Sequence, residues 1–168
     1  EAYNAAVRRL KFEELFVAQI RLQLIRLRRN RYSRGILFEN VGDNFNLFYK
    51  KYLPFELTGA QKRVLKDIRR ATAHGHQMNR LLQGDVGSGK TIVALLSMLL
   101  AADNGYQSCL MAPTEILAQQ HYQGISELLK DMPVQVRLLT GSTKTKERKV
   151  LLQELAEGSV QILIGTHA

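Results

Sequence analysis

The sequence is short of cysteine and of long apolar runs, and each shortage excludes a class of protein. Cys109 is the only cysteine in 168 residues, so the chain can form neither an internal disulfide nor a multi-cysteine zinc site. Its apolar neighbours in the sequence predict a small buried side chain. A single thiol indicates a reducing compartment, so we expect a cytoplasmic protein, and no apolar run is long enough to span a membrane, so we expect no membrane partner.

What is present is an excess of basic residues. The 24 Lys and Arg outnumber the 15 Asp and Glu, which gives a net charge of +9, and residues 1–34 hold nine of the basic residues. Such a basic segment indicates a polyanionic partner such as nucleic acid. A solvated helix face, or docking onto an acidic neighbouring domain, explains the same charge, and the sequence leaves these alternatives open.

Hydrophobic periodicity predicts a long helix followed by an α/β region. Residues 5–29 contain no Gly or Pro and repeat apolar residues at helical spacing, whereas residues 30–54 predict a linker whose aromatic side chains pack on a neighbour. From Thr58 onward helices and strands alternate, which predicts a parallel sheet, here incomplete, with helices on both faces. The expected helices are 59–73, 90–103, 114–130 and 144–157, and the expected strands are 80–83, 107–112, 134–139 and 160–165.

The octapeptide GDVGSGKT, residues 84–91, matches the phosphate-binding pattern G-x-x-x-x-G-K-[ST] at every fixed position. It lies between an expected strand and an expected apolar helix, so its backbone N–H groups and the helix dipole can both face a phosphate. Lys90 can neutralise the phosphate charge and the Thr91 hydroxyl can ligate Mg²⁺. The motif therefore predicts a nucleoside triphosphate, ATP, and Mg²⁺ as cofactors. The remaining cradle residues are Gly84, Gly87, Ser88 and Gly89.

A second motif lies about 25 residues before this loop and has two interpretations. Thr58 followed by Gln61 forms the capping box S/T-x-x-E/Q at the start of an expected helix. A glutamine amide also matches the donor and acceptor on the edge of adenine, and Phe55 could stack on the base. The nearby phosphate-binding loop favours the adenine interpretation.

Three small polar segments follow expected strands. Thr114 is a natural helix N-cap, Thr140 and Gly141 open a second loop, and Thr166 lies in a third. The carboxyl ends of parallel strands meet at one edge of a sheet, which is where open α/β sheets bind ligands. Three such loops predict an edge that contacts the backbone phosphates of a nucleic acid, although Thr114 alone is explained by capping.

A phosphate-hydrolysing enzyme of this type also needs a carboxylate at a strand end, and no expected strand ends in Asp or Glu. We therefore expect these residues alone to lack ATPase and unwinding activity. Two rival interpretations remain: a basic binding module with a vestigial loop, and a small-molecule kinase that would not use Gln61 on adenine.

Taken together, these motifs resemble the superfamily 2 DNA helicases, and more narrowly the RecG family of ATP-dependent branch-migration helicases. The segments that carry the resemblance are 57–61, 84–91, 112–121 and 165–168. Residues 9–16 are similar to the long helix that joins the wedge domain to the motor in that family. The Mfd transcription-repair factors share several of the motor motifs, but the RecG resemblance is closer over this helix.

The resemblance implies a RecA-like fold and a piece of a longer protein. Residues 1–54 would be the basic helix and linker, and residues 55–168 the front half of the first motor domain. The parent protein would use ATP to drive branch migration or fork reversal on branched DNA in recombination and repair, together with a wedge domain and a second motor domain. The alternative is a nucleotide- and DNA-binding module of another superfamily 2 translocase, such as the transcription-repair coupling type.

Overall fold

The computed structural model describes residues 2–32, 35–75 and 77–167, apart from the side chains of residues 29–32. The backbone forms two compact units, which we describe separately. The first contains Glu1–Leu37 and Ala71–Arg80, and the second contains Phe38–Arg70 and Leu81–Ala168.

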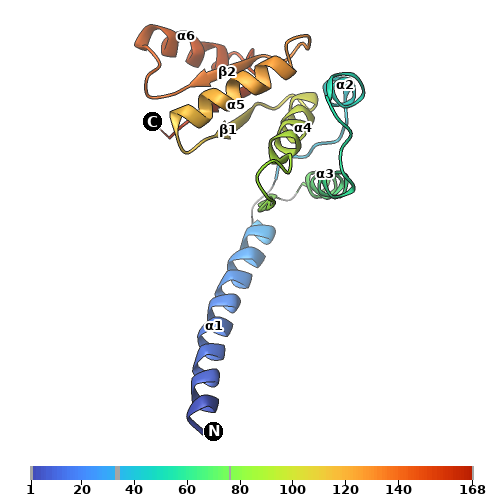
Figure 1. The fold of residues 1–168 in the computed structure, drawn as a ribbon. Coiled ribbons are helices and arrows are strands. Elements are labelled where there is room, and N and C mark those ends of the chain that lie inside the picture. The colour runs from blue at the N-terminus through green and yellow to red at the C-terminus, as the bar shows by residue number, and fades with distance from the viewer. Residues whose placement is uncertain (1, 33–34, 76, 168) are drawn as a thin grey trace. The chain divides into compact units, whose positions relative to one another are not determined.

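The first unit is built on helix α1, Ala2–Tyr32, which confirms the expected helix and extends it at both ends (Figure 1). Many of its apolar side chains are exposed, among them Leu15 at 66% and Leu22 at 59%. After this helix the N–H of Gly35 donates to the carbonyl of Gly75 at 2.8 Å, which joins the two segments of the unit.

The second unit contains a parallel three-stranded sheet, as expected from the alternation of elements. Its strands are β1 (Ser108–Met111), β2 (Val136–Leu139) and β3 (Ile162–Gly165), and their spatial order is β1-β3-β2. Met111, Gly165 and Leu139 lie side by side in the register, so the loops that follow the three strands leave from the same edge.

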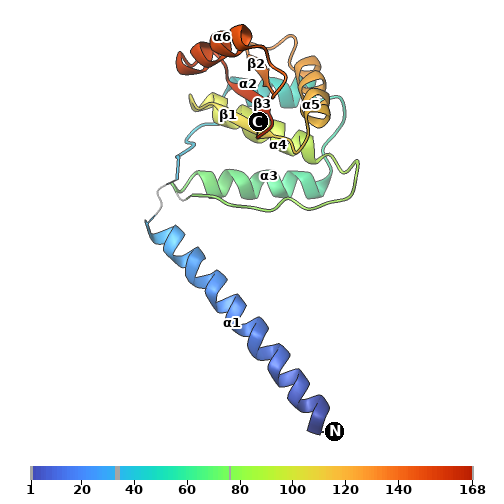
Figure 2. The ribbon, with the colours of Figure 1, turned by 90° about the vertical axis from the view of Figure 1, so that its left-hand side faces the viewer.

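Helices cover both faces of this sheet (Figure 2). Helices α4 (Lys90–Asp103) and α5 (Glu115–Leu128) pack on the face that carries Ile162 and Ile164, where the core is fully buried. Helix α6 (Thr145–Ala156) lies on the opposite face, because Arg137 points away from its neighbour Val136 and pairs with Glu154 of this helix.

One prediction about this sheet is wrong: Cys109 is exposed rather than buried. It shares its face of β1 with Met111, which is 53% exposed. The core helices pack on the other face, so an apolar run in the sequence identified the strand correctly but not the direction of this side chain.

The expected linker over residues 30–54 is also partly wrong, because it contains helix α2 (Asp43–Leu47) and the π-helical turn η1 (Phe48–Tyr52). The expected packing of its aromatic residues is confirmed by Phe48, which is completely buried. The start of α2 has no side-chain cap of its own; instead Asp103 at the end of α4 accepts the N–H groups of Gly42, Asn44 and Phe45 at 3.0, 2.9 and 3.0 Å.

The expected strand over residues 80–83 is not formed. Helix α3 (Gly59–Thr72) and α4 agree closely with their predicted bounds, but no strand in the described part of the chain pairs with the residues before the glycine loop. Leu81 is 87% exposed. A strand forms only when its backbone N–H and C=O groups find partners, so an apolar run is not enough.

Candidate nucleotide and nucleic-acid site

The glycine loop passes directly into α4 and leaves the start of that helix open. Gly89 is the N-cap in the left-handed region at φ +76°, where side chains are disfavoured, and no side chain caps the helix. Gly87 has φ +79°. The first N–H groups of α4 therefore remain available for an anion.

Lys90 is the first residue of α4, and its ammonium group lies over the loop. Its Nζ donates to the carbonyls of Gly84 and Asp85 at 2.8 and 2.6 Å and lies 3.5 Å from Ser88 Oγ. These three partners are neutral, so none of them neutralises the positive charge of Lys90. Thr91 follows in the first turn of the same helix, which is the position expected for a hydroxyl ligand of Mg²⁺.

Gln61 links the start of α3 to the glycine loop. Its Oε1 accepts the N–H of Thr58 at 2.8 Å and its own N–H donates to Thr58 Oγ1 at 3.2 Å, so the capping box is confirmed. Its Nε2 donates to the carbonyl of Ser88 at 2.9 Å. This last contact joins residues 27 positions apart and leaves no local signal in the sequence.

The structure does not bring every predicted nucleotide residue together. Gln61 lies against the glycine loop, but Phe55 is 47% exposed, and in the described ranges no hydrogen bond or ring contact links it to that loop. The contact of Gln61 and Phe55 with adenine stays a prediction.

The three polar loops lie at one edge of the sheet, and two of them are joined. Thr114 caps α5 by accepting the N–H of Leu117 at 3.3 Å. The next residue, Glu115, reaches the second loop, where its two carboxylate oxygens accept the N–H of Ser142 at 3.1 Å and the Ser142 hydroxyl at 3.0 Å. Sequence reasoning missed Glu115 and Ser142 because only the fold makes them neighbours.

The predicted hydroxyls of the second and third loops differ in their surroundings. Thr140 is only 2% exposed, and its Oγ1 lies 2.9 Å from the Ser142 hydroxyl, while Gly141 beside it is exposed. The N–H of Thr166 donates to the carbonyl of Leu139 at 3.3 Å, but the Thr166 hydroxyl is buried without a hydrogen-bond partner. Their contact with a nucleic-acid backbone stays a prediction.

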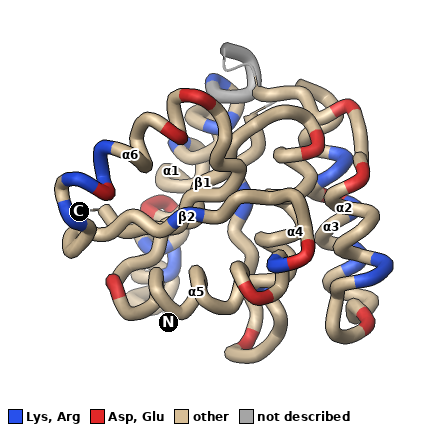
Figure 3. Tube along the Cα trace, turned by 90° about the horizontal axis from the view of Figure 1, so that it is seen from above, with Lys and Arg blue, Asp and Glu red and all other residues tan. Residues whose placement is uncertain are grey.

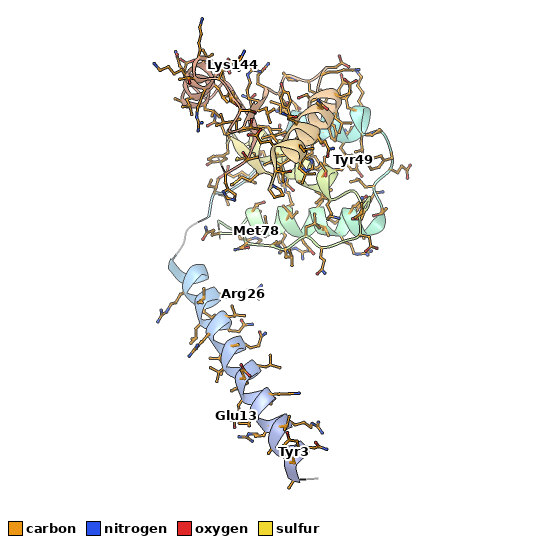
Figure 4. All side chains as sticks on the ribbon, turned by 60° about the vertical axis from the view of Figure 1, so that its left-hand side comes forward. Tyr3, Glu13, Arg26, Tyr49, Met78 and Lys144 are labelled. Carbon is orange, nitrogen blue, oxygen red and sulfur yellow. The ribbon has the colours of Figure 1, made fainter. Side chains whose placement is uncertain are left out.

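A cluster of basic residues beside the second loop was also missed. Lys144 is the N-cap of α6, and Lys146, Arg148 and Lys149 follow on its exposed surface (Figures 3 and 4). A cavity of about 550 Å³ next to them is lined by Lys146 and by Thr140 and Ser142 of the loop. The run of four basic residues within six positions was the available sequence signal.

Metal and membrane sites are not evident. Over residues 2–32, 35–75 and 77–167, no group of three or more His, Cys, Asp or Glu side chains could hold a metal ion. The three strands end in Met111, Leu139 and Gly165, so the expected lack of a strand-end carboxylate holds for them. A search of the same part of the chain also found no helix long and apolar enough to cross a membrane.

A glycine loop that opens a buried helix beside a parallel sheet defines a P-loop domain of the α/β class. A family model of the DEAD/DEAH box helicases matches residues 58–168, and the chain belongs to this family.

The more specific resemblance to RecG helicases is confirmed by curated relatives. The chain is 46% identical to the "ATP-dependent DNA helicase RecG" of Streptococcus pneumoniae serotype 4, over 99% of this chain and 24% of that protein. It is 46% identical to the same helicase of Bacillus subtilis, over 100% of this chain and 24% of the relative. The chain therefore spans about a quarter of the length of these proteins.

A solved structure gives the same result for the fold. A RecG bound to a three-way DNA junction superposes with a TM-score of 0.85 and 42% sequence identity, over 95% of this chain and 22% of that one. The RecA-like α/β fold, truncated and preceded by a helix, is confirmed by this match.

Proposed function

We propose that this chain is the nucleotide-binding front part of an ATP-dependent DNA helicase that acts on branched DNA. The observation that carries the proposal is the glycine loop, in which the uncapped start of α4 and the Lys90 ammonium group face the same loop without a cancelling carboxylate. The high identity to RecG helicases over the whole chain supports a motor function rather than a small-molecule kinase.

The residues of the loop fit ATP and Mg²⁺. The backbone N–H groups at Gly87 and Gly89 would bind the phosphates, together with that of Ser88 once it leaves the Asp85 carbonyl, to which it donates at 3.2 Å, and Lys90 would neutralise the β- and γ-phosphates. Thr91 would supply one hydroxyl ligand to Mg²⁺, while the further carboxylate that the metal needs is absent from the strand ends described above. ATP bound here supplies the free energy for movement on DNA.

The DNA partner is proposed from the edge loops and the basic residues beside them. The loops that carry Thr114, Thr140, Gly141 and Thr166 would approach backbone phosphates, and the exposed Lys144 and Lys146 would add charge. The three-way junction bound by the solved RecG favours branched DNA. A wedge domain, a second motor domain and a cytoplasmic location remain parts of this proposal.

The test is ATP hydrolysis by a full-length protein that carries this chain, with a three-way junction as the stimulating DNA. We expect Lys90→Ala to lower the stimulated rate by roughly 10²- to 10³-fold, because a group that stabilises phosphate charge is lost. Lys130→Ala, which removes an exposed lysine at the end of α5, is the matched control and should leave the rate unchanged.

Two results would contradict the proposal. If the Lys90→Ala protein hydrolysed ATP at the wild-type rate, the glycine loop would not be the nucleotide site. Equal stimulation by linear duplex and by the junction would remove the preference for branched DNA.

A further inference from the structure

The carboxylate of Glu115 accepts hydrogen bonds from the loop that follows β2, which is predicted to contact nucleic-acid phosphates. The Oε1 and Oε2 atoms of Glu115 accept both donors of Ser142, its backbone N–H at 3.1 Å and its hydroxyl at 3.0 Å. These are the same two kinds of donor that proteins offer to the oxygen atoms of a nucleic-acid phosphate. Two hydrogen bonds to one ionised acceptor form a strong contact.

The loop has closing hydrogen bonds of its own, besides those to Glu115. The N–H of Thr143 donates to the carbonyl of Thr140 at 3.2 Å, and the N–H of Thr140 donates to Thr143 Oγ1 at 3.0 Å, so the turn is closed by its own residues. Thr140 is buried and contributes its hydroxyl to Ser142 rather than to the surface. Ser142 is exposed in this turn, and Glu115 occupies both of its donors.

We propose that the Glu115 carboxylate is an internal competitor for a DNA backbone phosphate on Ser142, so that DNA must displace it when it engages this loop. This inference rests on the proposed path of DNA across the three loops. A phosphate and a carboxylate cannot share the same two donors, and their like charges repel each other at contact distance. Glu115 thereby weakens DNA contact at this loop and makes it conditional on movement of one side chain.

The decisive variant is Glu115→Gln in a full-length protein that carries this chain. Glutamine has nearly the same shape but no charge, so a phosphate can replace it more easily. We expect a three-way junction DNA to bind about 3- to 10-fold more tightly, which corresponds to the net value of one or two hydrogen bonds.

Three further variants separate competition from simpler explanations. Glu147→Gln removes an equal charge from the neighbouring start of α6, where no hydrogen bond among the described residues joins the carboxylate to the loop, and should change affinity by less than about two-fold. Ser142→Ala should weaken binding, and it should reduce the gain from Glu115→Gln in the double variant. Thr114→Ala tests the neighbouring loop on the same proposed path. Urea unfolding of each variant checks that the fold is unchanged.

The outcomes distinguish this inference from the proposed function. If Ser142→Ala and Thr114→Ala weaken binding but Glu115→Gln does not tighten it beyond Glu147→Gln, only the competition is wrong. Weaker binding by Glu115→Gln also overturns it, because the carboxylate would then support DNA contact. If neither Ser142→Ala nor Thr114→Ala changes affinity, the DNA path across this edge is wrong, and the competition with it.

Discussion

At the scale of single residues, Gln61 shows that a structural and a functional role can share one side chain. Its amide completes the capping box with Thr58 and also donates to the carbonyl of Ser88 in the glycine loop. Both ends of the amide are therefore engaged. An adenine contact by the same group requires the side chain to exchange one of these partners for the base.

We expect Thr58→Ala to lower the free energy of unfolding by about 1 kcal/mol, because it breaks the capping box, and Gln61→Ala to lower it by more, because it also removes the bond to the Ser88 carbonyl. Only Gln61→Ala should also weaken nucleotide binding, by roughly 5- to 10-fold for ATP and by less for GTP. Calorimetric titration and urea unfolding of the full-length protein measure both effects. Equal losses for ATP and GTP would leave Gln61 with a structural role alone.

The second prediction at this scale concerns Gly89. A methyl group there would collide with the amide nitrogen of Gln61, whereas one on Gly87 would meet nothing within 4 Å, and both residues have positive φ. We expect each change to Ala to lower the free energy of unfolding by about 1–2 kcal/mol for the backbone conformation, and Gly89→Ala by about 1 kcal/mol more.

A double-mutant cycle isolates this collision. In a Gln61→Ala background the additional cost of Gly89→Ala should disappear, while the cost of Gly87→Ala should stay the same. A Gly89→Ala cost that does not depend on Gln61 would mean that the two residues do not meet in solution.

At the scale of elements, α2 begins where another helix ends. Asp103 is the last residue of α4, where a negative charge is unfavourable for the helix dipole, yet it accepts three N–H groups at the start of α2. The side chain of Asn104 adds two bonds, accepting the N–H of Asn40 at 3.0 Å and donating to its carbonyl at 2.9 Å. The end of the helix that follows the glycine loop is thus fixed to residues 40–45.

We expect Asp103→Ala to lower the free energy of unfolding by about 2–3 kcal/mol, because three part-buried N–H groups lose a charged acceptor. Asp103→Asn should lose less, since one oxygen remains. Hydrogen exchange should become faster at Gly42, Asn44 and Phe45. Glu127→Ala, which breaks an exposed ion pair with Lys130, serves as the control and should show no measurable change. Unaltered exchange at these three amides in Asp103→Ala would contradict the assigned role.

The elements that could be predicted from the sequence are those whose signals are local. The bounds of α4 follow from Gly89 and the apolar run after it, and the start of α5 follows from Thr114. Residues 43–52 could not be predicted as helical, because their cap is supplied by Asp103, about 60 positions away. The strand expected over residues 80–83 failed for the related reason that a strand needs a distant partner.

The same distinction applies to the candidate site. The glycine loop and the capping box are contiguous patterns and were found in the sequence. The bonds from Gln61 to Ser88 and from Glu115 to Ser142 each cross 27 positions and depend on how α3, α5 and the sheet pack. The basic residues at the start of α6 had a local signal in the sequence, but the basic partner site was predicted only at residues 1–34, where the larger number of basic residues lies.

At the scale of the whole molecule, two of the basic segments can be tested against each other as contacts for DNA. Residues 1–34 carry nine basic residues, and contact with DNA, docking onto an acidic protein neighbour or a solvated helix face would each explain them. The start of α6 carries four basic residues beside the loop that holds Ser142. If DNA follows the edge of the sheet, the second group contributes to binding whatever the first group contacts.

We therefore expect that changing Lys144, Lys146 and Lys149 to Gln flattens the dependence of DNA affinity on salt. Each lost phosphate contact removes about 0.9 from the slope for duplex DNA, so the triple variant should lose up to about 2.7. The matched variant changes Arg21, Arg26 and Arg28 of α1 to Gln and removes the same charge.

Binding of a three-way junction by the full-length protein, titrated at several salt concentrations, gives both slopes. A flatter slope in the α1 variant as well would assign that helix to DNA, and an unchanged one would leave a protein neighbour or a solvated helix face to explain its charge. An unchanged slope in the α6 variant would contradict the prediction, because DNA binding must release fewer counterions once three lysines that contact its phosphates are removed.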